Sequence, residues 1–481
     1  MDIAIVGGGA AAVGLLDALA AVEEGETGTI TVFEPSAHLW RGRPYGPDLD
    51  AVRVNAPPAI MSIRHGDFGH YAAWLGERGN AHRDELLGQP LVPRALYGDY
   101  LAHTAEKALA ALGEAGRLVR VVADRVTEVM RSGVRLVLRT EDTGEYDATH
   151  VVLCVGTGTP PDLYGLAGTG SSDGRAGFTS DPYPLADTLD HVDDGDEVAV
   201  IGSGLTAVDV VVSLAARGHT GRITLLSRSG VLPYVWQRPI DRRPRHLSAE
   251  RVTELHRARA GNVGLDDLIG LLRAELADVG EDFDTFAAEL LATAHGDPVR
   301  RLRCQIEAID DSRIGRRMLQ EAVHTVGPYA WRLLPESDRA RLRRHLRTAT
   351  SVASPMVPVN ATTLMRLLDS RQLVIVPGIR AIERVNGRFR VHGADHGENG
   401  ADGVINAVNP APHAVPDAAR QLVGSLVGTG LATLHPSGGV LPADPRLHVV
   451  GDLMGGGSVI TASIPGVAAQ AFRAAQALRT P

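Results

Sequence analysis

The sequence predicts an α/β protein built from two Rossmann-like dinucleotide-binding domains, the second of which carries a helical insertion. Three observations predict this class. An apolar strand with a glycine turn opens the chain at Ile3–Gly14, the same arrangement returns at Glu197–Val211, and charged amphipathic helices interrupt the second unit. One such turn would be weak evidence, but two in order indicate an internal duplication.

Composition narrows the classes of protein. The 481 residues are 44% hydrophobic, which is enough for a large core and two or three domains. The net charge is −9 and the arginines are dispersed among acidic residues, so no basic face indicates nucleic-acid binding. No apolar run is long enough to span a membrane, and Asp2 is unlike the basic start of a signal peptide, so we expect a cytoplasmic protein.

The two cysteines, Cys154 and Cys304, are far apart in the sequence. This spacing excludes a C-x-x-C redox pair and a disulfide framework. Cys154 lies in the apolar stretch VVLCVG, where we expect it to be a small core residue.

The first glycine turn is in the stretch IAIVGGGAAAVG. Gly7, Gly9 and Ala12 fit the frame G-x-G-x-x-G/A, in which the first glycine makes the turn, the second lets a pyrophosphate approach and the third position must be small. The following helix presents free N–H groups and a positive dipole end to the phosphates. We therefore predict a dinucleotide at this turn.

The next strand, Thr29–Glu34, ends in a carboxylate. A carboxylate at this place accepts hydrogen bonds from the adenosine ribose and repels a 2′-phosphate. Glu34 therefore favours FAD or NAD over NADP at the first site, the alternative being a strand-end Glu that only faces solvent.

Two loops rich in glycine and proline follow, PSAHLWRGRPYGPD and VRVNAPPAIMS. A loop beyond the second strand can reach a flavin ring, so Asn55, followed by Pro57, is the candidate catalytic residue at the N5/C4a edge. Its amide can donate to a flavin peroxide without reacting. The alternative is an ordinary Asn-initiated turn. Arg41 of the first loop is assigned to cofactor binding.

Beyond these loops, FGHYAAWL is an aromatic segment whose helix-spaced rings suit either a cavity wall or the core, and PRALYGDYLAHTAEKALAAL predicts a helix. From Leu118 the pattern predicts an antiparallel meander that returns to a buried strand ending at Gly156. Val126 in the meander and Gly156 are further candidates for cofactor binding. Residues 160–196 are expected to be a linker with a surface tip at Ser171–Gly174.

The second glycine turn repeats the first with Gly202, Gly204 and Ala207. Its next strand ends in Ser227-Arg228, where a hydroxyl and a guanidinium suit a 2′-phosphate. This site therefore favours NADPH, the alternative being an exposed arginine without a ligand.

The helical insertion is predicted at about residues 239–350, with solvated charged faces. Its Gly327-Pro328 break and Trp331 are candidates for an approach to the active cleft. After it, QLVIVPGIRAIERVNGRFRVHG and ADGVINAVNPAP repeat the order of a meander and a buried strand.

The final segment contains a strand, LHVVGD, a glycine bend and a helix. Asp452 at the strand end is predicted to bind the ribityl or pyrophosphate side of a flavin, the alternative being helix capping. Pro465 is expected at a break or in the first turn of the final helix.

With these motifs the chain resembles the two-dinucleotide-binding-domain flavoproteins, and in particular a bacterial FAD/NAD(P)-binding family related to flavin-containing and N-hydroxylating monooxygenases. The resemblance covers nearly the full length and rests on six motifs besides Glu34. They are IVGGGAAAVG, GRPYG with VNAPPAIMS, VPRALYGDYL, VIGSGLTAVDVVVSLAARGH with LSRSGVLP, LPESDRARLRRHL and the closing VVGD.

The resemblance implies that Asn55-x-Pro57 is the counterpart of an Asn-x-Pro that helps to hold the peroxide in the monooxygenases. The chain departs from the family at Val408-Asn409, in place of T-G, and at Gly457-Ser458, in place of a bend with Glu. Both departures fall near the expected cleft and indicate an unusual substrate.

The sequence therefore predicts an FAD domain at 1–165 and 406–481 and an NADPH domain at 166–405. The expected function is an FAD- and NADPH-dependent monooxygenase that uses O2 on a small molecule, with N-hydroxylation of an amine as one reaction. An NADPH-dependent flavin oxidoreductase that reduces a small organic acceptor is the alternative, and a non-enzymatic dinucleotide-binding sensor is a third. No metal, nucleic-acid or membrane partner is indicated, and a homodimer is compatible with this architecture.

Overall fold

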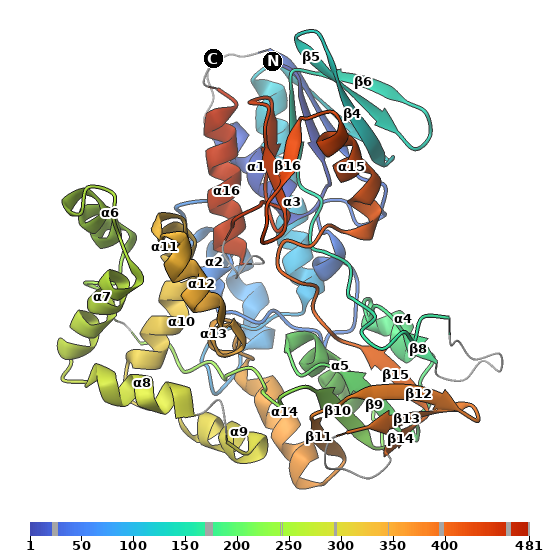
Figure 1. The fold of residues 1–481 in the computed structure, drawn as a ribbon, viewed down its shortest axis with the longest axis vertical. Coiled ribbons are helices and arrows are strands. Elements are labelled where there is room, and N and C mark those ends of the chain that lie inside the picture. The colour runs from blue at the N-terminus through green and yellow to red at the C-terminus, as the bar shows by residue number, and fades with distance from the viewer. Residues whose placement is uncertain are drawn as a thin grey trace.

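The computed structural model describes residues 1–21, 27–168, 177–240, 242, 244–292, 296–344, 346–393, 399–457 and 463–479. Within these residues, two five-stranded parallel sheets dominate the architecture (Figure 1). The α/β class predicted from the two glycine turns is confirmed, because each turn follows the central strand of one sheet.

The first sheet has the order β18-β7-β1-β2-β3, with all neighbours parallel. Its central strand, β1, is fully buried, as its four apolar residues predict. The strands are β1 (Ile3–Val6), β2 (Gly28–Phe33), β3 (Arg117–Val122), β7 (His150–Leu153) and β18 (Leu447–Val449).

The second sheet repeats this plan in the order β11-β10-β9-β15-β8, again with all neighbours parallel. The central strand β9 is followed by the second glycine turn. The strands are β8 (Phe178–Thr179), β9 (Val198–Ile201), β10 (Ile223–Ser227), β11 (Leu373–Pro377) and β15 (Gly403–Asn406).

We call the part of the structure around the first large sheet the first half and the part around the second large sheet the second half. Small antiparallel sheets accompany both halves. They are β4 (Val126–Ser132), β5 (Arg135–Thr140) and β6 (Glu145–Ala148); β12 (Ala381–Val385), β13 (Arg388–His392) and β14 (Asn399–Ala401); and the pair β16 (Ala432–Leu434) and β17 (Val440–Pro442). The prediction that the first meander begins at Leu118 was wrong. Residues Arg117–Val122 pair in parallel with β2 and close the edge of the first large sheet.

Helices cover the first sheet. Helix α1 packs closely on α16, since a Cβ at Gly14 would lie 3.3 Å from the Ala471 side chain. In the aromatic segment FGHYAAWL, Tyr71 of α2 lies in a buried aromatic cluster, whereas Phe68 is half exposed. The bounds are α1 (Ala10–Ala21), α2 (His70–Leu75), α3 (Arg94–Glu114), α15 (Arg420–Gly428) and α16 (Ile464–Ala477), whose first turn contains Pro465 as predicted.

Helices α4 (Leu185–Leu189), α5 (Leu205–Ala216) and α14 (Pro358–Asp369) flank the second sheet. Helix α4 and strand β8 show that residues 160–196 are more than the linker that was expected. Apolar side chains of this segment, such as Leu185, are buried in the core of the second half. The expected tip Ser171–Gly174 lies outside the described residues.

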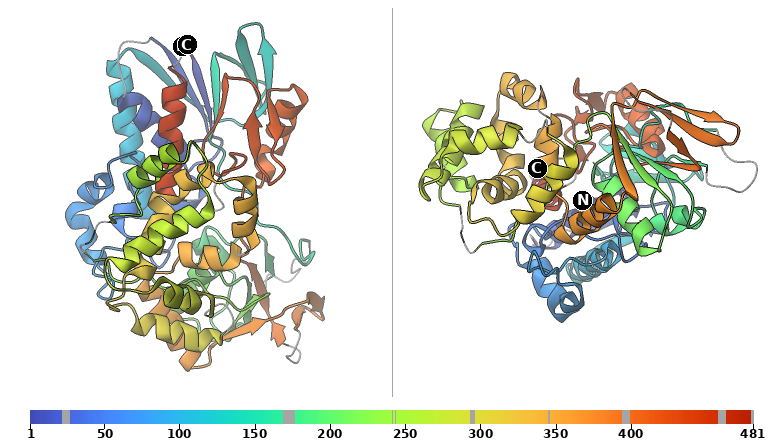
Figure 2. Two further views of the ribbon diagram at one scale, coloured as in Figure 1. Left: turned by 60° about the vertical axis from the view of Figure 1, so that its left-hand side comes forward. Right: turned by 90° about the horizontal axis from the view of Figure 1, so that it is seen from below.

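The predicted insertion is helical. It contains α6 (Ala249–Ala258), α7 (Leu265–Ala277), α8 (Phe283–Ala292), α9 (Pro298–Glu307), α10 (Gly315–Thr325), α11 (Gly327–Leu333), α12 (Glu336–Arg344) and α13 (Leu346–Ala353). Seen from below, these yellow to amber helices lie on one side and the green and orange strands of the second half lie on the other (Figure 2).

Short 3-10 turns occur at Arg43–Tyr45, Pro58–Ile60, Gly76–His82 and Asp417–Ala419. Among the residues that the structure describes, no helix is both long and apolar enough to cross a membrane.

The two halves meet at a buried ion pair. Arg94 of α3 donates from Nη2 to Asp209 of α5 at 2.5 Å, and the hydroxyl of Tyr183 donates to the same carboxylate oxygen. The Asp209 side chain is fully buried and that of Arg94 is 10% exposed. This contact joins α3 of the first half to α5, the helix that follows the second glycine turn.

Candidate dinucleotide sites

The first glycine turn requires glycine for a steric reason. Gly7 has φ of +102°, and a Cβ there would lie 2.3 Å from the carbonyl oxygen of Cys154. Its N–H donates to the carbonyl of Phe33 at 2.8 Å. The turn is therefore wedged between β2 and β7 and cannot accept a side chain.

The second residue of the frame is also closely approached. A Cβ at Gly9 would lie 3.4 Å from Cα of Gly42, in the loop that follows β2. Ala12 is fully buried, as the frame demands of its third position. The loop at Gly42 thus lies over the N-terminus of α1, where a pyrophosphate would sit.

Glu34 lies beside this turn and its carboxylate is held in place. One oxygen accepts from the N–H of Gly8 at 2.8 Å, and the other accepts from the N–H of Ser36 at 2.9 Å. A carboxylate fixed at the end of β2 and still partly exposed fits the geometry of a ribose-binding residue. That role stays a prediction.

Arg41 lies near the same turn, but its guanidinium contacts α3. It donates to the carbonyl of Ala95 at 3.1 Å and pairs with Asp99 at 2.5 Å. The side chain is 26% exposed. These bonds position the loop around Gly42, and direct cofactor binding by Arg41 stays a prediction.

Val126 and Gly156 occupy different surroundings. Val126 is 2% exposed and packs in the core cluster that contains Phe33 and Leu138. Gly156 follows β7, is exposed, and has φ of +80° with open space where a Cβ would be. The chain at Gly156 is therefore open to the approach of a ligand, whereas the side chain of Val126 serves the core.

Asn55 has an unsatisfied polar atom. Its side-chain oxygen is buried and has no hydrogen-bond partner among the described residues. Its backbone carbonyl accepts from the indole N–H of Trp236 at 2.7 Å. A buried polar atom is normally hydrogen-bonded, so this end of the side chain is unusual. Such a group fits a cofactor or substrate that completes it.

Asp452 follows β18 and is 6% exposed. Its carbonyl accepts from Nδ1 of His413 at 2.8 Å, and the neighbouring Gly451 donates to the side chain of Gln470 on α16 at 2.6 Å. These bonds fix the strand end against the final helix. Helix capping, the alternative considered for Asp452, belongs to Ser463, which accepts from the N–H of Gly466. Ser458 lies outside the described residues.

The second glycine turn has the same construction. Gly202 has φ of +120°, and a Cβ there would lie 2.7 Å from the carbonyl oxygen of Ala407. Gly204 precedes α5, and Ala207 is fully buried. The side chain of Asn409 accepts from the hydroxyl of Thr206 at 3.1 Å, which places the Val408-Asn409 departure directly at this turn.

Ser227 and Arg228 end the strand next to the second turn. The Ser227 hydroxyl accepts from the N–H of Gly230 at 2.7 Å. Arg228 is exposed, and within the described part of the chain its guanidinium makes no hydrogen bond or ion pair. A free cation at this place fits a 2′-phosphate.

Two tryptophans contact the first half, Trp236 just before the insertion and Trp331 within it, and no sequence motif predicted their partners. Trp236 reaches Asn55, and Trp331 donates from its indole N–H to the carbonyl of Gly456 at 3.3 Å. His324 lies 6.2 Å from Trp236, ring centre to ring centre, and burial lowers the pKa of this imidazole. Trp236 therefore covers the Asn55 loop, and Trp331 of the insertion covers the closing glycine bend.

No group of three or more His, Cys, Asp or Glu side chains suitable for a metal ion occurs within the described residues. Cys154 is 3% exposed, and burial raises the pKa of its thiol, which agrees with the core role predicted for it.

Comparisons with known proteins agree with this arrangement. Residues 4–158 match a family model described as FAD-NAD(P)-binding. An uncharacterised protein of Mycobacterium bovis is 26% identical over 328 residues, and Mycobacterium tuberculosis proteins match equally. That alignment spans 58% of this chain and 60% of the relative's length.

Two solved structures align over almost the whole chain. L-lysine 6-monooxygenase from Pseudomonas syringae is 16% identical with a TM-score of 0.55, covering 99% of this chain and 98% of that one. The ornithine N-hydroxylase of Kutzneria sp. 744, solved with reduced FAD, NADP+ and L-ornithine, is 15% identical with a TM-score of 0.52 and covers 100% and 99%. Residues 4–158 thus match an FAD-NAD(P)-binding model, and the chain as a whole has the fold of these two solved structures.

Proposed function

We propose that this protein is an FAD- and NADPH-dependent monooxygenase that hydroxylates the nitrogen of a small amine. The observation that carries the proposal is the contrast between two equivalent glycine turns. The first has the fixed carboxylate of Glu34 at the end of its neighbouring strand, and the second has Ser227 and the exposed Arg228. One site suits FAD and the other suits NADPH, so the pair supports electron transfer from one cofactor to the other.

The residues of the first half fit a bound flavin. Gly7 and Gly9 form the tight turn that precedes the N-terminus of α1, where a pyrophosphate would bind, and the buried side-chain oxygen of Asn55 lacks a partner among the described residues. FAD, when bound there, supplies hydride acceptance and oxygen chemistry. The protein's part is to position the substrate with Asn55 and to exclude water beneath Trp236 and Trp331.

Two observations favour oxygen transfer over reduction of a disulfide. Cys154 is buried and Cys304 is far from it in the sequence, so the chain has no dithiol to exchange with a substrate. Two of the proteins aligned over almost the whole chain with TM-scores above 0.5 are named as a lysine monooxygenase and an ornithine hydroxylase, which supports an amine as the substrate class.

The test uses the purified chain loaded with FAD. NADPH is added without oxygen while the flavin absorbance is followed, and air is then admitted with L-lysine, L-ornithine or another primary amine. We expect rapid bleaching by NADPH and a hydroxylamine product whose amount approaches the NADPH consumed. Peroxide in place of product with every amine, together with efficient anaerobic reduction of benzoquinone, would instead support a flavin oxidoreductase.

The variant Asn55→Ala tests the candidate catalytic residue. Loss of one positioned hydrogen-bonding group near developing charge is expected to lower product formation roughly 10- to 100-fold. Flavin bleaching by NADPH should be preserved, so more of the NADPH ends as peroxide. The exposed Asn262→Ala serves as the matched control. Equal product yield from Asn55→Ala and the parent would contradict the assignment.

A further inference from the structure

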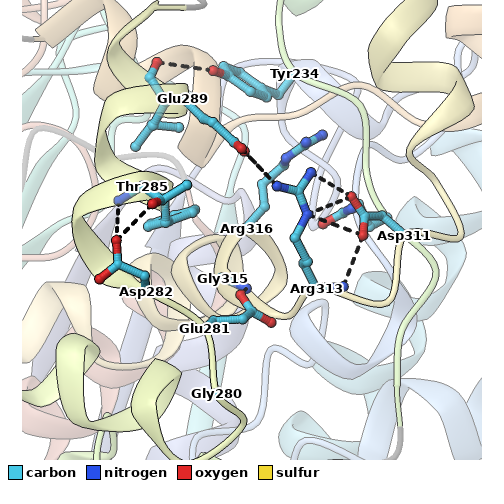
Figure 3. Close-up of a pocket in the computed structure, with 13 residues that line it drawn as sticks. Tyr234, Gly280, Glu281, Asp282, Thr285, Glu289, Asp311, Arg313, Gly315 and Arg316 are labelled. Atoms are coloured by element: carbon cyan, nitrogen blue, oxygen red, sulfur yellow. Dashed lines mark hydrogen bonds and ion pairs between the residues drawn. The ribbon is translucent and has the colours of Figure 1, made fainter.

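A cavity of about 390 Å³ lies inside the helical insertion, between the loop before α8, helix α8 and the start of α10 (Figure 3). This volume is in the range of small-molecule sites. None of the residues assigned to the two glycine turns lines the cavity. It is therefore a separate place on the protein, whose occupancy can be measured without turnover.

The distinctive group in this cavity is Arg316. Its guanidinium extends between Tyr234 and Arg313 (Figure 3), and its Nη1 atom is buried without a hydrogen-bond partner among the described residues. The guanidinium carbon lies 5.7 Å from the centre of the Tyr234 ring. Burial lowers the pKa of Arg316, so the surroundings leave this cation poorly compensated. A buried donor of this kind gains most from an anionic acceptor.

The carboxylates around the cavity do not fill that need, because each is engaged elsewhere. Glu281 accepts from the N–H groups of Ile314 at 2.5 Å and Gly315 at 3.1 Å, at the N-terminus of α10. Asp282 accepts from the N–H and the hydroxyl of Thr285, both at 2.8 Å. These two carboxylates are compensated by helix N-termini.

Arg313 engages the other two carboxylates. It pairs with Glu289 at 2.8 Å and with Asp311 at 2.8 Å. Arg316, which lies beside this group, has no such partner (Figure 3). The four negative charges nevertheless limit the ligand, since a dianion such as phosphate would meet more repulsion than a single carboxylate.

The remaining wall is partly apolar, and it also includes Thr285 and Gln237, whose amide nitrogen donates to the carbonyl of Ala308 at 2.7 Å. Tyr234, which is 4% exposed, Phe286 and Leu290 present rings and a branched chain to the cavity. The Tyr234 hydroxyl points to the carbonyl of Leu290 at 3.5 Å, so the ring is held beside α8. A ligand body that contacts this wall would be aromatic or aliphatic.

We infer that this cavity binds a small monocarboxylate whose carboxyl group pairs with Arg316 and whose apolar body packs on Tyr234, Phe286 and Leu290. The inference goes beyond the proposed redox function and does not depend on it. Tyr234 lies two residues before Trp236, which donates to the carbonyl of Asn55, so the site is connected by chain to the candidate active loop.

Isothermal titration of the FAD-loaded chain with 3-phenylpropionate tests the inference, in the absence of NADPH. We expect saturable binding that weakens about tenfold or more when the probe is 3-phenylpropionamide, which has the same shape without the charge. Inorganic phosphate should not compete. No saturable heat with 3-phenylpropionate, or equal affinity for the amide, would overturn the proposal.

The variant Arg316→Gln should lose binding by a similar factor, whereas Arg257→Gln on the exposed end of α6 should bind as the parent does. Removal of an uncompensated buried charge is not expected to lower the melting temperature, which separates lost binding from lost folding. If Arg316→Gln fails to fold, Arg316→Lys keeps the charge but loses the planar fork and should weaken binding. Unchanged affinity in the folded variant would overturn the assignment of Arg316.

Discussion

Gly7 and Gly202 show how a single residue sets each dinucleotide site. Each has a positive φ, and a Cβ would lie 2.3 Å from the Cys154 oxygen and 2.7 Å from the Ala407 oxygen respectively. The motif was readable in the sequence because the turn is local. Which carbonyl blocks the side chain was not, since the blocking strand arrives much later in the chain.

Arg228 carries a prediction about cofactor choice. Arg228→Gln removes the cation that suits a 2′-phosphate, so KM for NADPH should rise about tenfold or more, whereas KM for NADH should change little. Steady-state oxidation of each cofactor measures this split, and Arg257→Gln is the matched surface control. An equal rise for both cofactors would show that Arg228 does not select the phosphate.

Asn55 and Asn409 make contacts that the local sequence could not predict. Asn55 was singled out by its place before a proline, but its contact with Trp236 joins positions 181 residues apart. The bond between Thr206 and Asn409 joins positions 203 residues apart. Such contacts depend on how the sheets are assembled, and no local pattern reports them.

Strand β3 shows the same limit at the scale of elements. Its valines and leucine indicate a strand, and such a sequence suits both an edge strand of a parallel sheet and a meander strand. The structure places β3 beside β2 and, in the second half, β11 beside β10. The repeat was thus predicted correctly in order, while the first strand of each supposed meander was assigned to the wrong sheet.

Strand β18 carries a prediction about pH. His448 lies in it with Nε2 buried and unpartnered in the described part of the chain. Burial lowers the pKa of His448 to about 4, with His150 acting in the same direction. The unfolded chain therefore takes up a proton near pH 6.5 that the folded chain resists.

The free energy of unfolding is thus unaffected by His448 above about pH 6.5, where the imidazole is neutral in both states. It falls as the pH drops from about 6.5 toward about 4, because the unfolded chain binds the proton more readily. Allowing for its partial exposure, we expect a loss of about 1–2 kcal/mol. Urea unfolding across this range measures it. His448→Gln should flatten the curve and the exposed His191→Gln should not, whereas the same slope in all three proteins would exclude His448 as the source.

At the scale of the whole molecule, the ion pair of Arg94 and Asp209 joins the two halves. Helix α5 follows the second glycine turn, and α3 shares a buried core with α1, which follows the first, so the contact links the supports of the two predicted dinucleotide sites. A buried charge that loses its partner is strongly destabilising, although replacing both charges by apolar groups need not be.

Asp209→Asn keeps the shape of the side chain but leaves Arg94 buried without a counter-charge. We expect a loss of about 3–5 kcal/mol, seen as a marked fall in the melting temperature. Arg94→Met combined with Asp209→Leu should recover part of it. The exposed pair of Arg251 and Glu254 provides the control, since Glu254→Gln should cost less than about 1 kcal/mol. Equal effects of the two single variants would show that the buried pair is not a clamp.

The order of strands in the first sheet also determines which half of the protein can finish folding first during synthesis. Strand β18 and helix α16 complete the first half, yet they are made after every strand of the second sheet. Until then the face of α1 around Gly14, which packs on both Ile63 and Ala471, lacks its contact with α16. The second half can therefore fold while the nascent first half still waits for its last strand, so translation that stalls between β15 and β18 should yield chains with one finished domain and one open, aggregation-prone one.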